Sequence, residues 1–160
     1  MKRCFTQLWK SGSENRSRSM VLAESEQLTA KKQHEDDFAY LLARSYLRLW
    51  QPEDPIPEQG SYWLIGAATW SQYDMKLLDA LTKAMATRLL AERIDVFSYD
   101  DQEAGNYFLA HYTDGKPLYN TPIMAHWVDG KLIKVEQAGL ALRYVVDHFD
   151  LPRSIMEHQS

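Results

Sequence analysis

Residues 121–139, TPIMAHWVDGKLIKVEQAG, decide the fold of this chain. After the Thr-Pro pair, the run IMAHWV (123–128) has the aliphatic and aromatic side chains typical of a strand. Asp129-Gly130 is the preferred dipeptide of a two-residue hairpin turn, because both residue types tolerate positive φ. The segment KLIKVEQA (131–138) then returns as the antiparallel partner. The stretch therefore predicts a β-hairpin that is entered through a proline.

Before this hairpin, predicted strands alternate with predicted helices, and one predicted helix follows it. Gly139 ends the hairpin, and apolar residues at helical spacing predict a closing helix over 140–150. Upstream, SYWLIGAA (61–68) is a short apolar run typical of a strand buried on both faces. The remaining predicted elements are helix 23–50, a helix that ends near 93, strand 93–99 and helix 102–112. Strands that alternate with helices are expected to pair in parallel. Because the two strands of the hairpin are antiparallel, the predicted sheet is mixed, with helices on both faces.

This order of elements resembles the thioredoxin fold over residues 62–151. The most specific part of the resemblance is the hairpin stretch, in which Pro122 matches the cis-proline of that family. Its second part is Ala-Thr-Trp at 68–70, where a strand ends and a long helix begins. The resemblance implies an α/β fold, a thioredoxin-like three-layer sandwich with a central mixed β-sheet and helices on both faces. Helix 23–50 would then be the usual N-terminal helix of the fold.

In thioredoxins the tryptophan is followed by Cys-x-x-Cys, but here it is followed by Ser71-Gln72-Tyr73-Asp74. Dithiol exchange needs one thiolate to attack and a second thiol to resolve the mixed disulfide. Neither Ser71 nor Asp74 supplies a thiol. In addition, Ile65 stands where the family usually carries a buried acid before this turn. We therefore expect a redox-inactive member of the thioredoxin-like superfamily, with no catalytic residues.

The segment from Ser71 to Asp74 has two interpretations. Ser-x-x-Asp before an apolar periodic run is close to a capping box, in which the Ser71 hydroxyl accepts the backbone N–H near Asp74. In the second interpretation it is the lip of a peptide groove. In the resembled family, the residue before the cis-proline lies beside this turn and pairs with an extended peptide. The groove implied by the resemblance consists of Trp70, Ser71, Gln72, Tyr73, Asp74, Thr121 and Pro122, with Tyr119 as a further candidate.

Composition excludes several other classes of function. Lys plus Arg number 18 and Asp plus Glu 22, and this net charge of −4 argues against a nucleic-acid partner. No apolar run approaches the roughly 20 residues that span a bilayer. The 5 histidines lack metal-ligand spacing and the 7 glycines form no phosphate-binding loop, so we expect no metal and no cofactor. A Ser71–His126–Asp74 hydrolase is disfavoured because the chain has no nucleophile elbow.

The single cysteine, Cys4, excludes a disulfide scaffold. It lies in a basic, Ser/Arg-rich segment over residues 1–22, which we expect to be a flexible leader. Alternatively, this segment targets an organelle or precedes the true start at Met20. Residues 23–151 are expected to form a single domain, and 152–160 a polar C-terminal tail. We expect a cytoplasmic location unless the leader is a targeting signal.

These observations favour a non-catalytic domain that binds a protein or peptide in an adaptor, chaperone-like or assembly role. Two alternatives stay open at the level of the sequence. One is a single-thiol thioredoxin-like oxidoreductase that uses Cys4, delivered by the flexible leader. The other is a purely structural or oligomerisation domain, which would need no groove.

Overall fold

The computed structural model describes residues 20–29, 32, 36, 38–39, 42–43, 47–88 and 92–157. The chain divides into two units, Met1–Asp36 and Asp37–Ser160. In the first unit, residues 20–29 form a helix whose side chains are all exposed. Cys4 and most of the predicted leader lie outside the described residues. The second unit contains the sheet and the candidate site.

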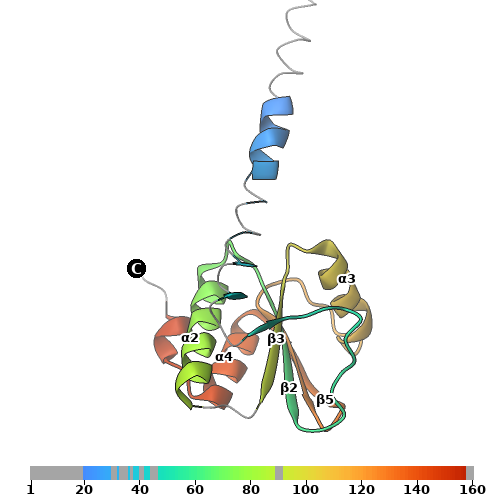
Figure 1. The fold of residues 1–160 in the computed structure, drawn as a ribbon, viewed down its shortest axis with the longest axis vertical. Helices are drawn as coiled ribbons and strands as arrows, with labels where there is room; N and C mark the ends of the chain where they lie inside the picture. The colour runs from blue at the N-terminus through green and yellow to red at the C-terminus, as the bar shows by residue number, and fades with distance from the viewer. Residues whose placement is uncertain are drawn as a thin grey trace, which may run out of the picture. The chain divides into compact units, whose positions relative to one another are not determined.

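The second unit is built on a five-stranded sheet with the order β1-β3-β2-β4-β5 (Figure 1). Strands β1, β3 and β2 are parallel, whereas β4 runs antiparallel to β2 and forms a hairpin with β5. Because Gly66 pairs with Ile123, the carboxyl ends of β2 and β3 lie at the same end of the sheet as the start of β4. The strands are β1 (Arg48–Leu49), β2 (Ser61–Ala67), β3 (Arg93–Ser98), β4 (Ile123–Val128) and β5 (Lys131–Gln137).

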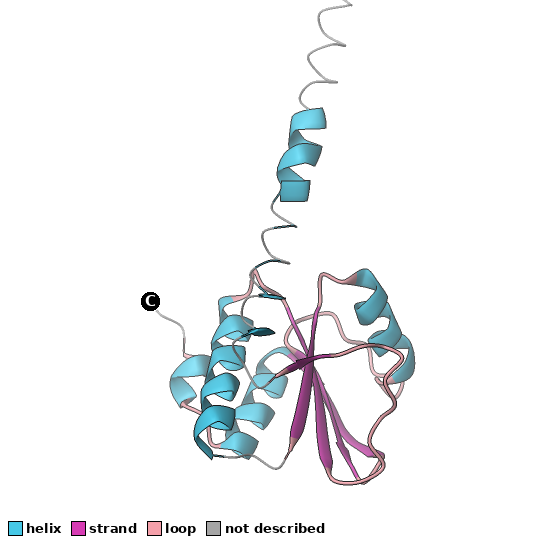
Figure 2. Ribbon diagram, in the orientation of Figure 1, coloured by secondary structure: helices cyan, strands magenta, loops and turns pink. Residues whose placement is uncertain are grey.

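Helices cover both faces of this sheet (Figure 2). Helices α2 (Gln72–Arg88) and α4 (Ala138–Phe149) lie on one face, and α3 (Gln102–His111) lies on the other. The result is the α/β three-layer sandwich with a mixed sheet that the sequence predicts, and the fold is thioredoxin-like. The predicted hairpin and the predicted closing helix are both confirmed.

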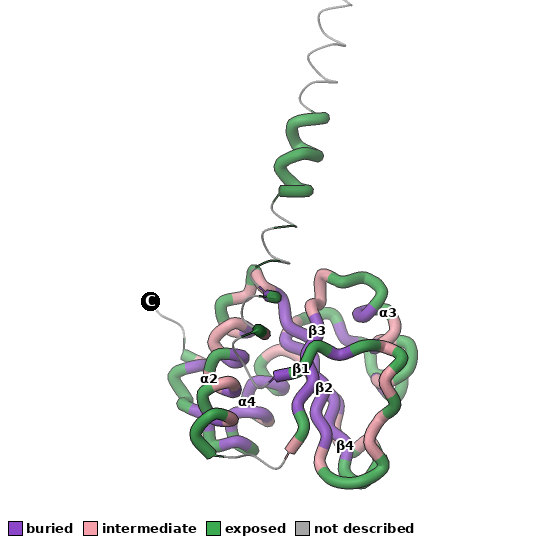
Figure 3. Tube along the Cα trace, in the orientation of Figure 1, coloured by how far each residue is buried: buried purple, intermediate pink, exposed green. Residues whose placement is uncertain are grey.

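The core is divided in two by the sheet, whose central strands are buried (Figure 3). Trp63 and Ile65 of β2 belong to the cluster on the α2 and α4 side, whereas Tyr62 and Leu64 belong to the cluster that includes Phe108 of α3. Alternating side chains of one strand thus fill both faces, as period-2 geometry requires. The prediction of a strand buried on both faces is confirmed.

The predicted helix 23–50 is wrong at its C-terminal end. The backbone of Arg48 and Leu49 forms strand β1, which pairs in parallel with Asp95 and Val96 of β3. The amide of Trp50 continues this pairing by donating to the Val96 carbonyl over 2.8 Å. Leucines and arginines are good helix formers, but pairing with a distant strand overrides this local preference here.

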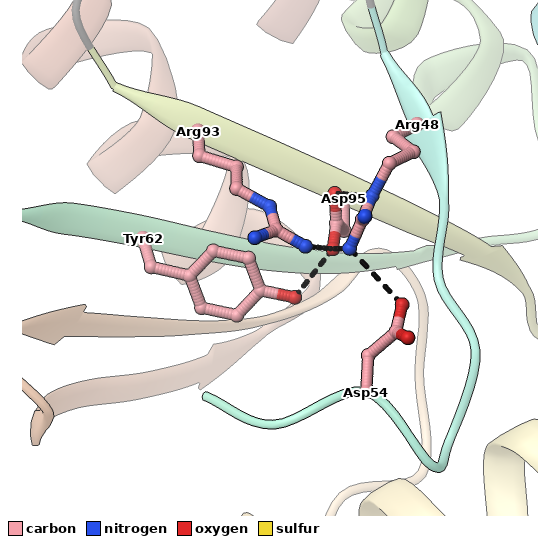
Figure 4. A network of polar contacts seen from close by, with 5 residues as sticks. All are labelled: Arg48, Asp54, Tyr62, Arg93 and Asp95. Carbon is pink, nitrogen blue, oxygen red and sulfur yellow. Dashed lines mark hydrogen bonds and ion pairs between the residues drawn. The ribbon is translucent and has the colours of Figure 1, made fainter. Parts of the chain in front are cut away.

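A buried carboxylate holds β1 against the sheet (Figure 4). Asp95, whose side chain is fully buried, accepts two hydrogen bonds from Arg48, at 3.1 and 2.9 Å. It also accepts the Tyr62 hydroxyl at 2.8 Å and the Arg93 guanidinium at 3.2 Å. Asp54 pairs with Arg48 from the solvent side at 3.0 Å. Burial raises the pKa of Asp95, although the hydrogen bond from Tyr62 and the charge of Arg48 oppose this rise.

The C-terminal segment packs on the core of the second unit, and side-chain contacts from a loop cover part of the open edge of its sheet. Within the predicted tail, Arg153–Met156 form the 3-10 helix η1, which buries Ile155 in the core. At the β5 edge, the Lys116 ammonium donates to the Val135 carbonyl over 3.0 Å and pairs with Glu136.

In the part of the chain that the structure describes, no helix combines the length and the apolar character needed to cross a membrane.

Candidate functional site

The turn between β2 and α2 is closed by hydrogen bonds at its first and last residues. The Ser71 hydroxyl donates to Asp74 Oδ1 over 2.9 Å, and the Asp74 amide lies 3.4 Å from the Ser71 oxygen. The Ser71 carbonyl accepts the amide of Met75 at 3.1 Å, which begins the hydrogen bonding of the helix. The predicted cap is therefore confirmed, and it fixes the N-terminus of α2 at the carboxyl end of β2.

Asp74 joins this turn to the loop before β4. Its side chain is fully buried and its Oδ2 accepts the Ala68 amide over 2.8 Å. Burial raises the pKa of Asp74, while hydrogen bonds from Ala68, Thr121 and Ser71 oppose the rise. The carboxyl group thus contacts both Ser71 and Thr121, so the two segments that the resemblance places side by side do lie together.

The loop before β4 is held from its other side by the end of β5. The peptide bond between Thr121 and Pro122 is cis, and the Pro122 carbonyl accepts the amide of Ala138 over 2.8 Å. The side-chain oxygen of Gln137 accepts the amides of Tyr119 at 2.7 Å and of Asn120 at 3.1 Å. Sequence reasoning missed Gln137, because a glutamine at the end of a strand gives no signal of a contact with a loop 17 residues away.

Two exposed aromatic side chains stand at this end of the sheet. Trp70 follows β2 and is 62% exposed, and Tyr119 precedes β4 and is 76% exposed. The Trp70 indole donates from Nε1 to Asp100 Oδ1 over 3.3 Å, which connects the end of β2 to the residue pair that follows β3. These rings offer apolar contact area to a ligand that approaches this end of the sheet.

The other predicted site residues differ in how much surface they offer. Gln72 is exposed, Ser71 and Thr121 are partly buried, and Pro122 is buried like Asp74. Tyr73 is also partly buried, because its side chain packs against the core cluster on the α2 side. The exposed part of the site therefore consists chiefly of Trp70, Gln72 and Tyr119, supported from below by the buried members.

His126 does not join Ser71 and Asp74. Its ring is stacked on Trp63 with the centroids 3.7 Å apart, and its two nitrogens contact the hydroxyls of Ser61 at 2.8 Å and Tyr144 at 3.0 Å. Burial, with the nearby His148, lowers the pKa of His126 to about 4. His126 is therefore a strand histidine whose two nitrogens are both engaged inside the protein, and the hydrolase triad does not assemble.

The polar groups in the turn between β2 and α2 form hydrogen bonds within the protein. The hydroxyl of Ser71 and the carboxyl of Asp74 are both engaged inside the protein. Among the residues that the structure describes, no group of three or more His, Cys, Asp or Glu side chains has the arrangement needed to hold a metal ion.

No protein-family model and no curated protein sequence matches this chain. Solved structures similar to it are thioredoxin-fold proteins. One is a putative oxidoreductase with a thioredoxin fold, at 12% identity and a TM-score of 0.42, which covers 58% of this chain and 80% of that one. A yeast mitochondrial 1-Cys peroxiredoxin has 16% identity and a TM-score of 0.41, covering 57% and 80%. Human ERp44 in its zinc-bound form has 10% identity and a TM-score of 0.38, covering 58% and 25%.

Proposed function

We propose that this domain binds an extended segment of a partner protein across the end of the sheet where β2 ends and β4 begins, and that it performs no thiol chemistry there. The observation that carries the proposal is the pair of exposed aromatic rings, Trp70 and Tyr119, at that end. Aromatic side chains are enriched in the energetically dominant positions of protein interfaces. The proposed groove consists of Trp70, Ser71, Gln72, Tyr73, Asp74, Thr121 and Pro122, together with Tyr119.

The rigid support of the rings favours binding. The side-chain oxygen of Gln137 accepts the consecutive amides of Tyr119 and Asn120 in the loop that presents the Tyr119 ring, and Asp74 links that loop to the turn beside Trp70. A loop that is already ordered loses less conformational entropy when a partner binds. The hydrogen bonds around the site therefore support a preformed recognition surface.

The residues at the start of α2, Ser71 and Asp74, are the reason for proposing that this site performs no thiol chemistry. Neither Ser71 nor Asp74 carries a thiol, so neither can attack a disulfide or resolve a mixed one. Of the two sequence alternatives, the oxidoreductase rests on Cys4, which lies outside the described residues, and a purely oligomerising domain would not need the exposed rings. We therefore do not propose either of them.

The remaining parts of the proposal concern the extent of the domain and its setting. We propose that the predicted domain over residues 23–151 carries the binding function, that a leader over 1–22 precedes it, and that the predicted tail over 152–160 adds η1 to its core. The net charge of −4 supports a protein partner over a nucleic acid. A cytoplasmic location suits a chain with a single cysteine, because a reducing compartment requires no disulfide.

The test is peptide binding by the full chain. A display library of random 12-residue peptides is selected on the immobilised protein, and the affinity of the best peptide is measured for the wild type, Trp70→Ala and Tyr119→Ala. We expect each substitution to weaken binding about tenfold or more. Ile133→Ala, which shortens a 51% exposed side chain in the middle of β5, is the control and should leave affinity unchanged.

Two results would contradict the proposed function. One is that no peptide is selected, or that the selected peptides bind equally well to Trp70→Ala and Tyr119→Ala. The other is that the wild type accelerates the reduction of insulin by dithiothreitol, which would show thiol chemistry that the proposal denies.

A further inference from the structure

The Trp70 indole is exposed, and its edge is fixed by a carboxylate. Its Nε1 donates to Asp100 Oδ1 over 3.3 Å, while 62% of its surface faces solvent. The ring face is therefore open to a ligand while the ring itself is held in place.

In the part of the chain that the structure describes, no ion pair engages the carboxylate of Asp100. Its second oxygen, Oδ2, is buried and has no hydrogen-bond partner, and within the described ranges no lysine or arginine pairs with this carboxylate. The neighbouring Asp101 is used differently, since it caps α3 by accepting the amides of Glu103 and Ala104. Asp100 thus places a negative charge without a described ion-pair partner at the edge of the indole.

The whole end of the sheet has the same sign of charge. The segments 66–75, 98–103, 118–123 and 137–140 meet there, and they contain Asp74, Asp100, Asp101 and Glu103 but no lysine or arginine. The next basic residues in the sequence serve other places. Lys76 lines a hollow of about 400 Å³ between α2 and η1, and Lys116 is engaged at the β5 edge.

We propose that Trp70 and Asp100 form a subsite for a positively charged side chain of the bound peptide. This inference rests on the proposed function, since it names the chemistry of the partner at the same site. A cation above an indole is attracted by the negative face of the π system. The hydrogen bond from Nε1 to the carboxylate increases electron density in the ring, and the negative charge of Asp100 adds a Coulomb attraction.

Other side chains fit this position less well. An apolar side chain packed on Trp70 would leave the charge of Asp100 unpaired in less polar surroundings, which is unfavourable. An acidic side chain would be repelled by Asp100 and by its neighbours at this end of the sheet. A guanidinium can both stack on the Trp70 ring and offer positive charge and hydrogen-bond donors to the Asp100 carboxylate.

The first measurement is the composition of the peptides selected from the random 12-residue library. We expect arginine and lysine to be enriched in them. The best peptide is then compared with a synthetic copy in which each arginine is replaced by citrulline and each lysine by acetyl-lysine. These replacements remove the charge and leave the protein unchanged, and we expect affinity to fall about tenfold.

The second measurement uses variants of the full chain. Trp70→Leu keeps an apolar side chain without a π system and should weaken the basic peptide about tenfold. Asp100→Asn should weaken it about threefold or more, and should reduce the loss of affinity between low and high salt. Asp114→Asn, at an exposed acid beyond the other end of α3, is the matched control and should change affinity less than about twofold.

The two proposals fail in different ways. If no peptide is selected, the proposed function is wrong. If peptides bind in a manner that depends on Trp70 and Tyr119 but contain no basic residue, or bind equally after the charge is removed, the cation subsite is overturned and the proposed function stands. Equal affinity of the wild type and Asp100→Asn, with equal salt dependence, would likewise overturn the subsite.

Discussion

The hydroxyl of Ser71 donates to Oδ1 of Asp74 over 2.9 Å, and Oδ2 of the same carboxyl accepts the Ala68 amide over 2.8 Å. Ser71 and Asp74 occupy the positions at which the resembled family carries its two thiols. Here the two side chains bond to each other and to the backbone, so their hydrogen-bonding capacity stabilises the junction between β2 and α2. These two residues therefore stabilise the turn that lies below the exposed aromatic rings.

Restoring both thiols tests whether the scaffold has kept the geometry for redox chemistry. We expect the double variant Ser71→Cys and Asp74→Cys to form an intramolecular disulfide and to accelerate insulin reduction by dithiothreitol, because a thiol at a helix N-terminus ionises more easily. The wild type should show no acceleration. Ser71→Cys alone is the control, and it should stay inactive because nothing resolves its mixed disulfide.

Asp74 should make the stability of the protein depend on pH. Burial raises its pKa above the ordinary value of 3.8, so the folded protein binds more protons than the unfolded chain between the two pKa values. Stability is therefore lost as pH rises from 3.8 through the folded pKa. Urea unfolding at a series of pH values should show this fall in the wild type and a smaller one in Asp74→Asn.

Removing the Asp74 side chain should be worse than neutralising it. Asp74→Ala leaves the Ala68 amide without its buried partner, so we expect a loss of about 2 kcal/mol in the free energy of unfolding. An Asp74→Ala variant as stable as the wild type at neutral pH would contradict the view that this carboxyl group stabilises the turn between β2 and α2.

His126 should produce the opposite pH dependence. Its pKa is about 4 in the folded protein against an ordinary 6.5, so the unfolded chain binds more protons in this window. Stability should fall as pH falls from 6.5 toward 4, by up to about 3 kcal/mol. His126→Gln keeps a donor and an acceptor without titrating, so its urea midpoints should change less with pH. His111→Gln, at an exposed histidine, is the control, and equal slopes in all three proteins would refute the role of His126.

The Asp95 network should contribute measurably to stability. Asp95→Ala removes the shared acceptor of Tyr62, Arg48 and Arg93, and we expect a loss of about 2 kcal/mol by urea unfolding. The loss is smaller than for a fully buried ion pair because the two arginine side chains are 51% and 43% exposed and regain water. Asp79→Ala, which breaks an exposed pair with Lys83, should cost less than about 0.5 kcal/mol.

Two glycines should respond in opposite directions to the same change. A Cβ on Gly66 would lie 2.5 Å from the Phe97 ring and 2.7 Å from Ile123, so Gly66→Ala should destabilise the protein by about 2 kcal/mol. A Cβ on Gly139 would meet nothing within 4 Å in the first turn of α4, so Gly139→Ala should stabilise by about 0.5 kcal/mol. Thermal unfolding of the two variants gives the comparison, and equal shifts would contradict this packing.

The features that the sequence predicts correctly are those in which the determining residues are neighbours in the chain. The hairpin turn depends on Asp129 and Gly130, and the cap of α2 depends on Ser71 and Asp74. In both cases a few adjacent residues choose the conformation, and a local pattern is sufficient. The same holds for β2, whose continuous apolar run marks a strand with a neighbour on each side.

The features that escaped prediction depend on partners far along the chain. Strand β1 exists because Arg48 meets Asp95, 47 residues later, and no pattern around Arg48 announces that pairing. Trp70 was predicted at the site, but its contact with Asp100 joins the ends of two parallel strands 30 residues apart. Only the assembled sheet brings such groups together.

The contact of Lys116 with the Val135 carbonyl has a consequence for how copies of this protein behave toward one another. Each copy presents the same outer strand β5, and an edge with unpaired carbonyls is a template on which identical chains add without limit. The Lys116 ammonium occupies one of these acceptors, and Lys131, Lys134 and Glu136 place charges along the same strand. These charges disfavour open-ended pairing of copies at one side of the sheet, while the rings of Trp70 and Tyr119 at the end of the sheet stay exposed.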